Sequence, residues 1–122
     1  MLLSLNKTRS KARFATAILQ MKQIQSAVEA SYNGAYPADV NQGLLPALGT
    51  NMTTWPTPPC TGWTYDYENW ASAQEIYVTL RRADTSVVAY LCIYDSVNNC
   101  SATADGPNIQ TNWPTKEITC TE

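Results

Sequence analysis

Four cysteines are the residues whose chemistry is easiest to read from the sequence. They are Cys60, Cys92, Cys100 and Cys120. None forms a Cys-x-x-Cys pair, and the 122 residues include no histidine, so a zinc site is not favoured. An even number of cysteines in a small domain is typical of disulfides made in an oxidising, extracytoplasmic compartment. The sequence does not decide between Cys60–Cys92 with Cys100–Cys120 and a Cys92–Cys100 bridge across a hairpin at residues 95–97.

The acidic residues offer one candidate for acid–base catalysis. Asp66 and Glu68 are two positions apart in an alternating stretch, so they share one face of a strand. Paired carboxylates can serve as a general acid and a general base. Nothing else in the sequence indicates a cleft around them. We therefore predict that the protein is not an enzyme and uses no cofactor.

A second group of oxygen-bearing side chains lies in one loop region near the C-terminus. It comprises Asp95, Asn98, Asn99 and Asp105. Their spacing matches no ordered calcium-binding loop, and Asn and Asp are also residues that turns favour. We therefore predict turn residues here rather than a metal site.

The aromatic residues present a choice between a binding surface and a core. The residues concerned are Trp55, Trp63, Trp70, Trp113, Tyr65 and Tyr67. If they were exposed together, they would form a surface suited to glycans or another adhesion target. Core packing accounts for most such residues. We expect a core role and keep an extracellular adhesive or glycan-binding module as an alternative function.

A long helix over residues 1–34 is the first element that must position these side chains. Stepping 100° per residue places an apolar band on one side of this helix. The band consists of Phe14, Ala17, Ile18, Met21, Ile24, Val28 and Tyr32. Asn33-Gly34 is a good stop for the helix, and Pro37 cannot continue it.

Positive charge crowds the start of this helix, where an isolated helix end disfavours it. The first turns hold Lys7, Arg9, Lys11 and Arg13. Because a helix N-terminus carries partial positive charge, we expect the helix to continue upstream. The end of a longer apolar segment would then be marked by Leu2, Leu3 and Leu5.

The charges are distributed unevenly along the chain. Residues 1–28 hold five basic and no acidic side chains, whereas residues 29–122 hold three basic and ten acidic ones. A basic arm on an acidic head predicts attraction between copies of the chain. Binding to nucleic acid is not predicted, because the head would repel phosphate.

An antiparallel sheet is predicted over residues 63–94, after an irregular connection over residues 35–62. Residues 63–67 and 75–82 alternate as strands do, and residues 83–85 suit a turn. Residues 86–94 are nearly all apolar or aromatic, which favours a central strand covered on both faces. Residues 95–122 are expected to form a loop and a short last strand at residues 116–120. The chain is thus predicted to be one α+β domain, a helix packed on three or four antiparallel strands.

Three stretches together resemble the type IV pilin and pseudopilin family. They are LLSLNKTRSKAR, AILQMKQIQSAVEASY and NGAYP, the last containing a Gly-x-Tyr-Pro element at Gly34, Tyr36 and Pro37. The resemblance is strong over residues 1–37, moderate to residue 94 and absent beyond it. The family's processing site, methylated first residue and buried acidic residue have no counterpart in these residues.

The resemblance implies a structural subunit of an extracellular, pilus-like filament that assembles through its N-terminal helix. Such a subunit is held in the inner membrane before the pilus assembly machinery extracts it. Contacts within the filament would involve Leu2, Leu3, Leu5, Arg9, Lys11, Arg13 and Leu19. The family's C-terminal disulfide loop would correspond to Cys100 and Cys120. A pseudopilin of a type II secretion system is the alternative within the family.

Overall fold

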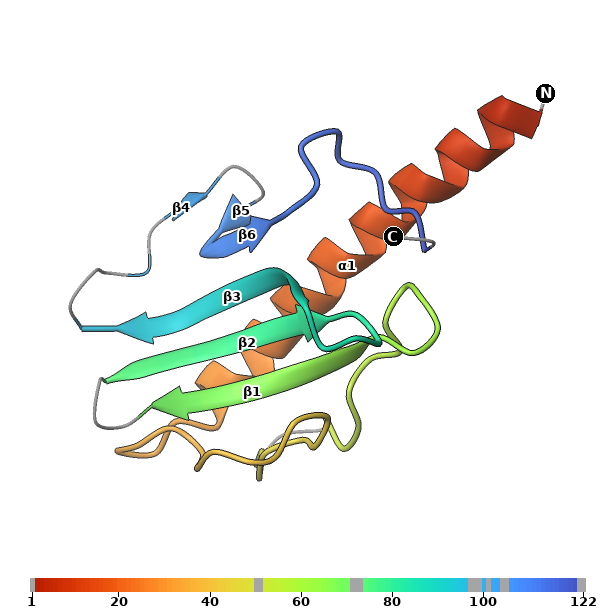
Figure 1. Cartoon of the computed structure of the whole chain (residues 1–122). Coiled ribbons are helices and arrows are strands. Elements are labelled where there is room, and N and C mark those ends of the chain that lie inside the picture. The colour runs from red at the N-terminus through yellow and green to blue at the C-terminus, as the bar shows by residue number, and fades with distance from the viewer. Residues whose placement is uncertain are drawn as a thin grey trace.

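The computed structural model contains one long helix and a four-stranded antiparallel sheet (Figure 1). It describes residues 2–49, 52–70, 74–96, 100, 102–103 and 106–120. The elements are α1 (Leu2–Ala30), β1 (Thr64–Trp70), β2 (Glu75–Arg81), β3 (Val87–Asp95), β4 (Ala102–Thr103), β5 (Gly106–Pro107) and β6 (Ile109–Thr111). The predicted α+β class is confirmed.

The sheet has the strand order β1-β2-β3-β6, with every neighbouring pair antiparallel. The two short strands β4 and β5 pair only with each other. Figure 1 shows α1 crossing one face of the sheet diagonally, with its first turns extending beyond the sheet. The sheet therefore has an inner face against α1 and an outer face on the opposite side.

The C-terminal two thirds of α1 pack on the inner face through the predicted apolar band. Ala17, Met21, Ile24 and Val28 are fully buried, and Phe14 and Ile18 pack against the same core. Their spacing alternates between three and four residues, as expected for a helix that buries one side. Tyr32 is an exception: it is 53% exposed, because α1 ends at Ala30 and the chain turns away from the sheet.

The helix ends four residues earlier than predicted because local hydrogen bonds terminate it. The Ser31 hydroxyl donates to the Ala27 carbonyl at 2.9 Å and accepts a bond from the Gly49 amide at 3.2 Å. Gly34 then adopts a φ of +78°, a conformation that glycine tolerates best. Gly34, which was predicted to end the helix, therefore makes a turn in the loop that follows it.

The inner face of the sheet supplies the rest of the core through alternate residues of each strand. The fully buried large side chains from the strands are Tyr65, Tyr67, Val78, Leu80, Val88, Leu91 and Ile109. Sequence alternation predicted this pattern for β1 and β2, and the turn at residues 83–85 is present, with the Ser86 amide bound to Asp84.

Two predictions about the strands are wrong. Residues 116–120 form no strand; the fourth strand is β6, which pairs with β3 through Ile109 and Gln110. Ile118 instead gives its amide hydrogen to the Ser10 carbonyl of α1. β3 is also not covered on both faces, because Val87 and Tyr90 are exposed on the outer face.

Candidate functional site

Two disulfides close the domain, between Cys60 and Cys120 and between Cys92 and Cys100. Their Cα–Cα distances are 5.4 and 5.5 Å, within the usual range for disulfides. The open choice is thereby decided in favour of the Cys92–Cys100 bridge. The alternative, Cys60–Cys92 with Cys100–Cys120, is wrong, and so is the C-terminal loop that the family resemblance implied. The pairing follows from the fold: Cys92 of β3 lies beside Cys100 in the loop that follows β3, and Cys120 of the C-terminal tail lies beside Cys60 in the connection over residues 35–62.

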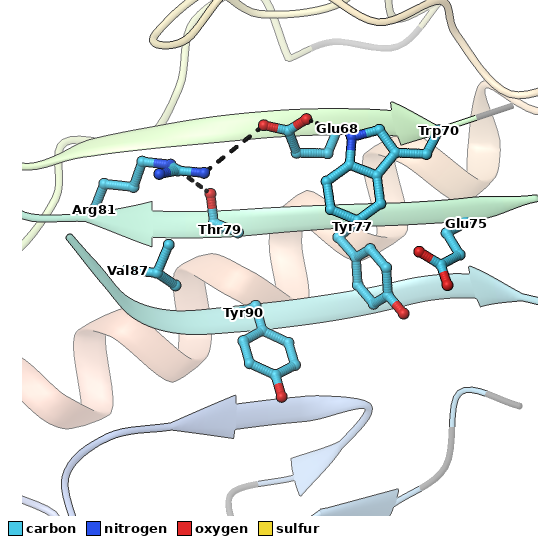
Figure 2. Close-up of a pocket in the computed structure, with 8 residues that line it drawn as sticks. All are labelled: Glu68, Trp70, Glu75, Tyr77, Thr79, Arg81, Val87 and Tyr90. Carbon is cyan, nitrogen blue, oxygen red and sulfur yellow. Dashed lines mark hydrogen bonds and ion pairs between the residues drawn. The ribbon is translucent and has the colours of Figure 1, made fainter. Parts of the chain in front are cut away.

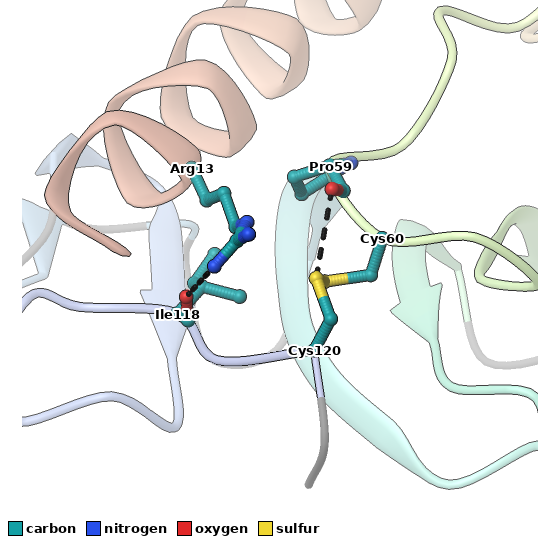
Figure 3. The surroundings of a disulfide bond; sticks show 5 residues. All are labelled: Arg13, Pro59, Cys60, Ile118 and Cys120. Carbon is teal, nitrogen blue, oxygen red and sulfur yellow. Dashed lines mark hydrogen bonds between the residues drawn. A yellow bond between two sulfur atoms is a disulfide. The ribbon is translucent and has the colours of Figure 1, made fainter. Parts of the chain in front are cut away.

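The C-terminal tail lies across α1 and is held to it by several contacts (Figure 3). Ile118 is fully buried; its amide binds the Ser10 carbonyl at 3.0 Å, and its own carbonyl accepts a bond from Arg13 at 3.4 Å. Trp113 stacks on Trp63 with ring centres 5.9 Å apart and meets Phe14 edge-on. The Cys60–Cys120 disulfide fixes the end of this tail. Together these contacts anchor α1 where it leaves the sheet.

The predicted filament-contact residues lie mostly on the projecting part of α1. Arg9 and Lys11 are exposed, whereas Arg13 is partly buried because it reaches the tail. Leu19 is 58% exposed, as its place outside the apolar band predicted. The side chains of Leu2, Leu3 and Leu5 lie outside the part of the chain that the structure describes, although their backbone belongs to α1.

A stripe of small side chains accompanies Leu19 on the exposed side of α1. Ala12, Ala15 and Thr16 are all exposed, and helical geometry places them on the same side as Leu19. Small side chains allow another helix to approach closely. Along α1, this stripe follows the basic turns and extends toward the middle of the helix.

The Gly34-x-Tyr36-Pro37 element connects α1 to β1. Tyr36 contacts the rings of Tyr32 and Tyr94, with centroid distances of 4.8 and 6.1 Å. The Pro37 carbonyl accepts bonds from the Tyr67 hydroxyl and from the side-chain Nδ2 of Asn69, each at 2.7 Å. The element therefore fixes the path of the chain after the helix.

The core role expected for these aromatic residues is confirmed for most of them. Trp63, Trp113, Tyr65 and Tyr67 are buried, and Trp55 is partly buried against Tyr65. They fill the space between α1, the long connection and the sheet. Only Trp70 of this set is strongly exposed, at 49%.

A different aromatic row occupies the outer face of the sheet (Figure 2). Trp70 of β1, Tyr77 of β2 and Tyr90 of β3 follow one another, with ring centres 6.0 and 6.2 Å apart. We call the hollow of about 340 Å³ around them the aromatic groove; its other described lining residues are Glu68, Glu75, Thr79, Arg81 and Val87. Sequence reasoning missed Tyr77 and Tyr90. Their alternation with buried Ile76, Val78 and Leu91 was the available signal.

Arg81 joins the two carboxylates that the sequence marked as a possible acid–base pair. Its Nε lies 3.3 Å from Asp66 Oδ2, and its Nη2 lies 3.8 Å from Glu68 Oε1. Burial first, then hydrogen bonding and charge repulsion from Asp66, raises the pKa of Glu68 from 4.5 to about 7. Glu68 can therefore hold a proton near neutral pH. The absence of enzymatic activity stays a prediction.

The residues considered for calcium are only partly described. Asp95 is buried and accepts a bond from the Tyr77 hydroxyl at 2.9 Å, whereas Asn98, Asn99 and Asp105 lie outside the described residues. Within the described part of the chain, no three His, Cys, Asp or Glu side chains gather as metal ligands would.

Two further findings bear on identity. None of the described helical residues forms a segment long and apolar enough to cross a membrane. When the chain is compared with protein family models, with curated proteins and with solved structures, it matches none of them.

Proposed function

We propose that this protein is a structural subunit of an extracellular pilus-like filament that assembles through α1. The observation that carries the proposal is the shape of the domain: a head with two disulfides, from which basic helical turns project (Figure 1). At 29 residues, α1 is roughly 44 Å long at 1.5 Å per residue. A rigid helix of this kind gives identical copies a common element through which to pack.

The exposed side of α1 supports contacts between helices of neighbouring copies. Ala12, Ala15 and Thr16 leave room for a second helix, and exposed Leu19 offers apolar surface to it. Burying a leucine contributes roughly 1.5–3 kcal/mol per subunit. The contact repeats at every subunit, so a small contribution is multiplied along a filament.

Charge complementarity supports contacts between the arm of one copy and the head of another. Lys7, Arg9 and Lys11 are exposed, and residues 29–122 carry a net charge of −7. Exposed ion pairs contribute only about 0–1 kcal/mol each, so these charges would set the register of the subunits more than their affinity.

The proposal includes an inner-membrane stage before assembly and a cell-surface location afterwards. A pseudopilin of a secretion system is the second possibility within the same proposal. The two differ in whether filaments on the cell surface contain the chain.

Reversal of the projecting charges tests the proposal. In producing cells, the triple variant Lys7→Glu, Arg9→Glu, Lys11→Glu is expected to reduce the amount of filament at least about fivefold, because like charges would then meet. The yield is measured on filaments sheared from the cells. Arg13 is left unchanged because it binds the tail.

The matched control is Lys22→Glu, which reverses an exposed charge on the same helix beside the sheet. It should leave assembly near normal. Equal yields from the triple variant and the unmodified protein, with normal protein levels, would contradict the role proposed for the basic turns.

A further inference from the structure

The aromatic groove presents ring surfaces that are held in fixed positions. The Trp70 indole donates to Glu68 at 3.0 Å, the Tyr77 hydroxyl donates to Asp95 at 2.9 Å, and the Tyr90 hydroxyl bonds to Gln110. Trp70 meets Tyr77 at 64°, and Tyr77 meets Tyr90 at 90°. Rings that are fixed in this way lose little freedom when a ligand binds.

These same bonds leave the groove with few hydrogen-bond donors for a ligand. The polar groups of the three rings already have partners within the domain. Arg81 is similarly occupied, because its guanidinium faces Asp66 and Glu68, donates to Thr79 at 3.2 Å and reaches the Thr85 carbonyl at 3.0 Å. The groove therefore offers ring faces and carboxylate oxygens rather than donors.

The charge around the groove is predominantly negative. Glu68, Glu75 and Arg81 line it, Asp95 binds Tyr77, and Asp66 lies behind Arg81. Because the pKa of Glu68 is about 7, this carboxylate is fully charged only above that pH, and the excess negative charge near neutral pH comes mainly from the other three carboxylates. Among the described residues, none forms a salt bridge with Glu75. Figure 2 shows its carboxylate beside the Tyr77 ring. An acidic groove with low-polarity walls attracts cations.

We propose that the aromatic groove binds a quaternary ammonium group, as carried by choline. Such a group is positively charged, has an apolar surface and needs no hydrogen-bond partner. Aromatic faces attract it through the cation–π interaction, and the neighbouring carboxylates add charge complementarity. A volume of about 340 Å³ is at the small end of the usual range for ligand pockets.

The main competing ligand is a neutral sugar, which would also stack on Trp70. Sugars need both donors and acceptors from the protein, and the donors of the groove are already engaged. A neutral ligand would also gain nothing from the surrounding carboxylates. The structure therefore favours the cation.

The test is a nuclear magnetic resonance titration of the 122-residue protein with choline, following the ring protons of Trp70, Tyr77 and Tyr90. Choline is expected to shift these resonances in a saturable manner. The neutral isostere 3,3-dimethylbutan-1-ol should bind at least about fivefold more weakly, because it lacks the charge. Cellobiose serves as the neutral sugar.

Variants locate the site on the protein. Trp70→Leu and Glu75→Gln should each weaken choline binding about fivefold or more. Their matched controls are Tyr32→Leu and Glu29→Gln, which change an exposed tyrosine and an exposed glutamate away from the outer face. The controls should bind choline as the unmodified protein does. Both groove positions are surface-accessible, so folding is checked simply from the spectrum of the buried tryptophans.

Three results would overturn the proposal. They are the absence of any saturable shift with choline, equal affinity for the neutral isostere, and tighter binding of cellobiose than of choline. Vesicles of phosphatidylcholine then identify the source of the cation. Co-sedimentation with them supports a headgroup displayed on a membrane, and choline binding without co-sedimentation supports a soluble ligand.

Discussion

Asp66 illustrates how a single buried carboxylate can control the chemistry of its neighbour. It is 3% exposed, and its Oδ1 has no hydrogen-bond donor among the described residues. A neutral Glu68 can supply the missing proton, whereas an ionised Glu68 adds a second negative charge. Burial is the largest cause that raises the pKa of Glu68 to about 7, and this arrangement with Asp66 adds to it even though Arg81 is nearby.

The raised pKa of Glu68 predicts how stability depends on pH. The native state binds this proton more tightly than the unfolded chain does, so the stabilisation is complete below about pH 4.5 and is lost as the pH rises through about 7. The variant Glu68→Gln should therefore gain stability relative to the unmodified protein between about pH 5 and about pH 8. At this partly exposed position the gain is on the order of 1 kcal/mol.

Urea unfolding at about pH 5 and at about pH 8 measures the difference in the free energy of unfolding between Glu68→Gln and the unmodified protein. Glu29→Gln is the control, because Glu29 lies exposed on α1, away from the outer face. A Glu68→Gln effect that is identical at the two pH values would refute the raised pKa of Glu68.

At the scale of elements, the tail is the part of the fold that links distant segments. It contacts α1 through Ile118, stacks on Trp63 through Trp113 and is covalently joined to the long connection through Cys120. The direction in which the first turns of α1 project therefore depends on the last residues of the chain. An assembly that uses α1 needs this direction to be fixed.

The two disulfides should differ in their contribution to stability because they close loops of different length. The Cys60–Cys120 bridge spans 60 residues and the Cys92–Cys100 bridge spans 8. From loop-closure entropy, Cys60→Ser with Cys120→Ser should cost about 4 kcal/mol, and Cys92→Ser with Cys100→Ser about 2.5 kcal/mol. Guanidinium unfolding of the two double variants gives both values.

The order of the two values is the informative part of this measurement. If removal of the Cys92–Cys100 bridge lowered the free energy of unfolding more than removal of the Cys60–Cys120 bridge, the tail would be held mainly by its noncovalent contacts. That result would also remove the covalent anchor from the account of how α1 is oriented.

Sequence patterns predicted the elements well where the signal is periodic and local. The apolar band of α1 and the alternation in β1 and β2 each follow from a repeat within one element. The tail could not be predicted in this way, because Ile118 owes its position to the Ser10 carbonyl, more than 100 residues away. The aromatic groove was missed for a related reason: Trp70, Tyr77 and Tyr90 come from three different strands and meet only through the sheet register.

For the whole molecule, the opposite placement of α1 and the aromatic groove has a consequence for the proposed filament. If copies pack through α1, the inner faces of the sheets turn toward the filament axis. The outer faces, with Trp70 and Tyr90, would then point to the surroundings. Assembly and ligand binding would use separate surfaces, so each can be tested without disturbing the other.

Electron cryo-microscopy of filaments sheared from producing cells tests the central claim most directly. We predict filaments whose repeating subunit is this chain, with α1 packed along the inside and the outer face of the sheet at the surface. Filaments that lack the chain, or that hold it with α1 turned outward, would contradict the account.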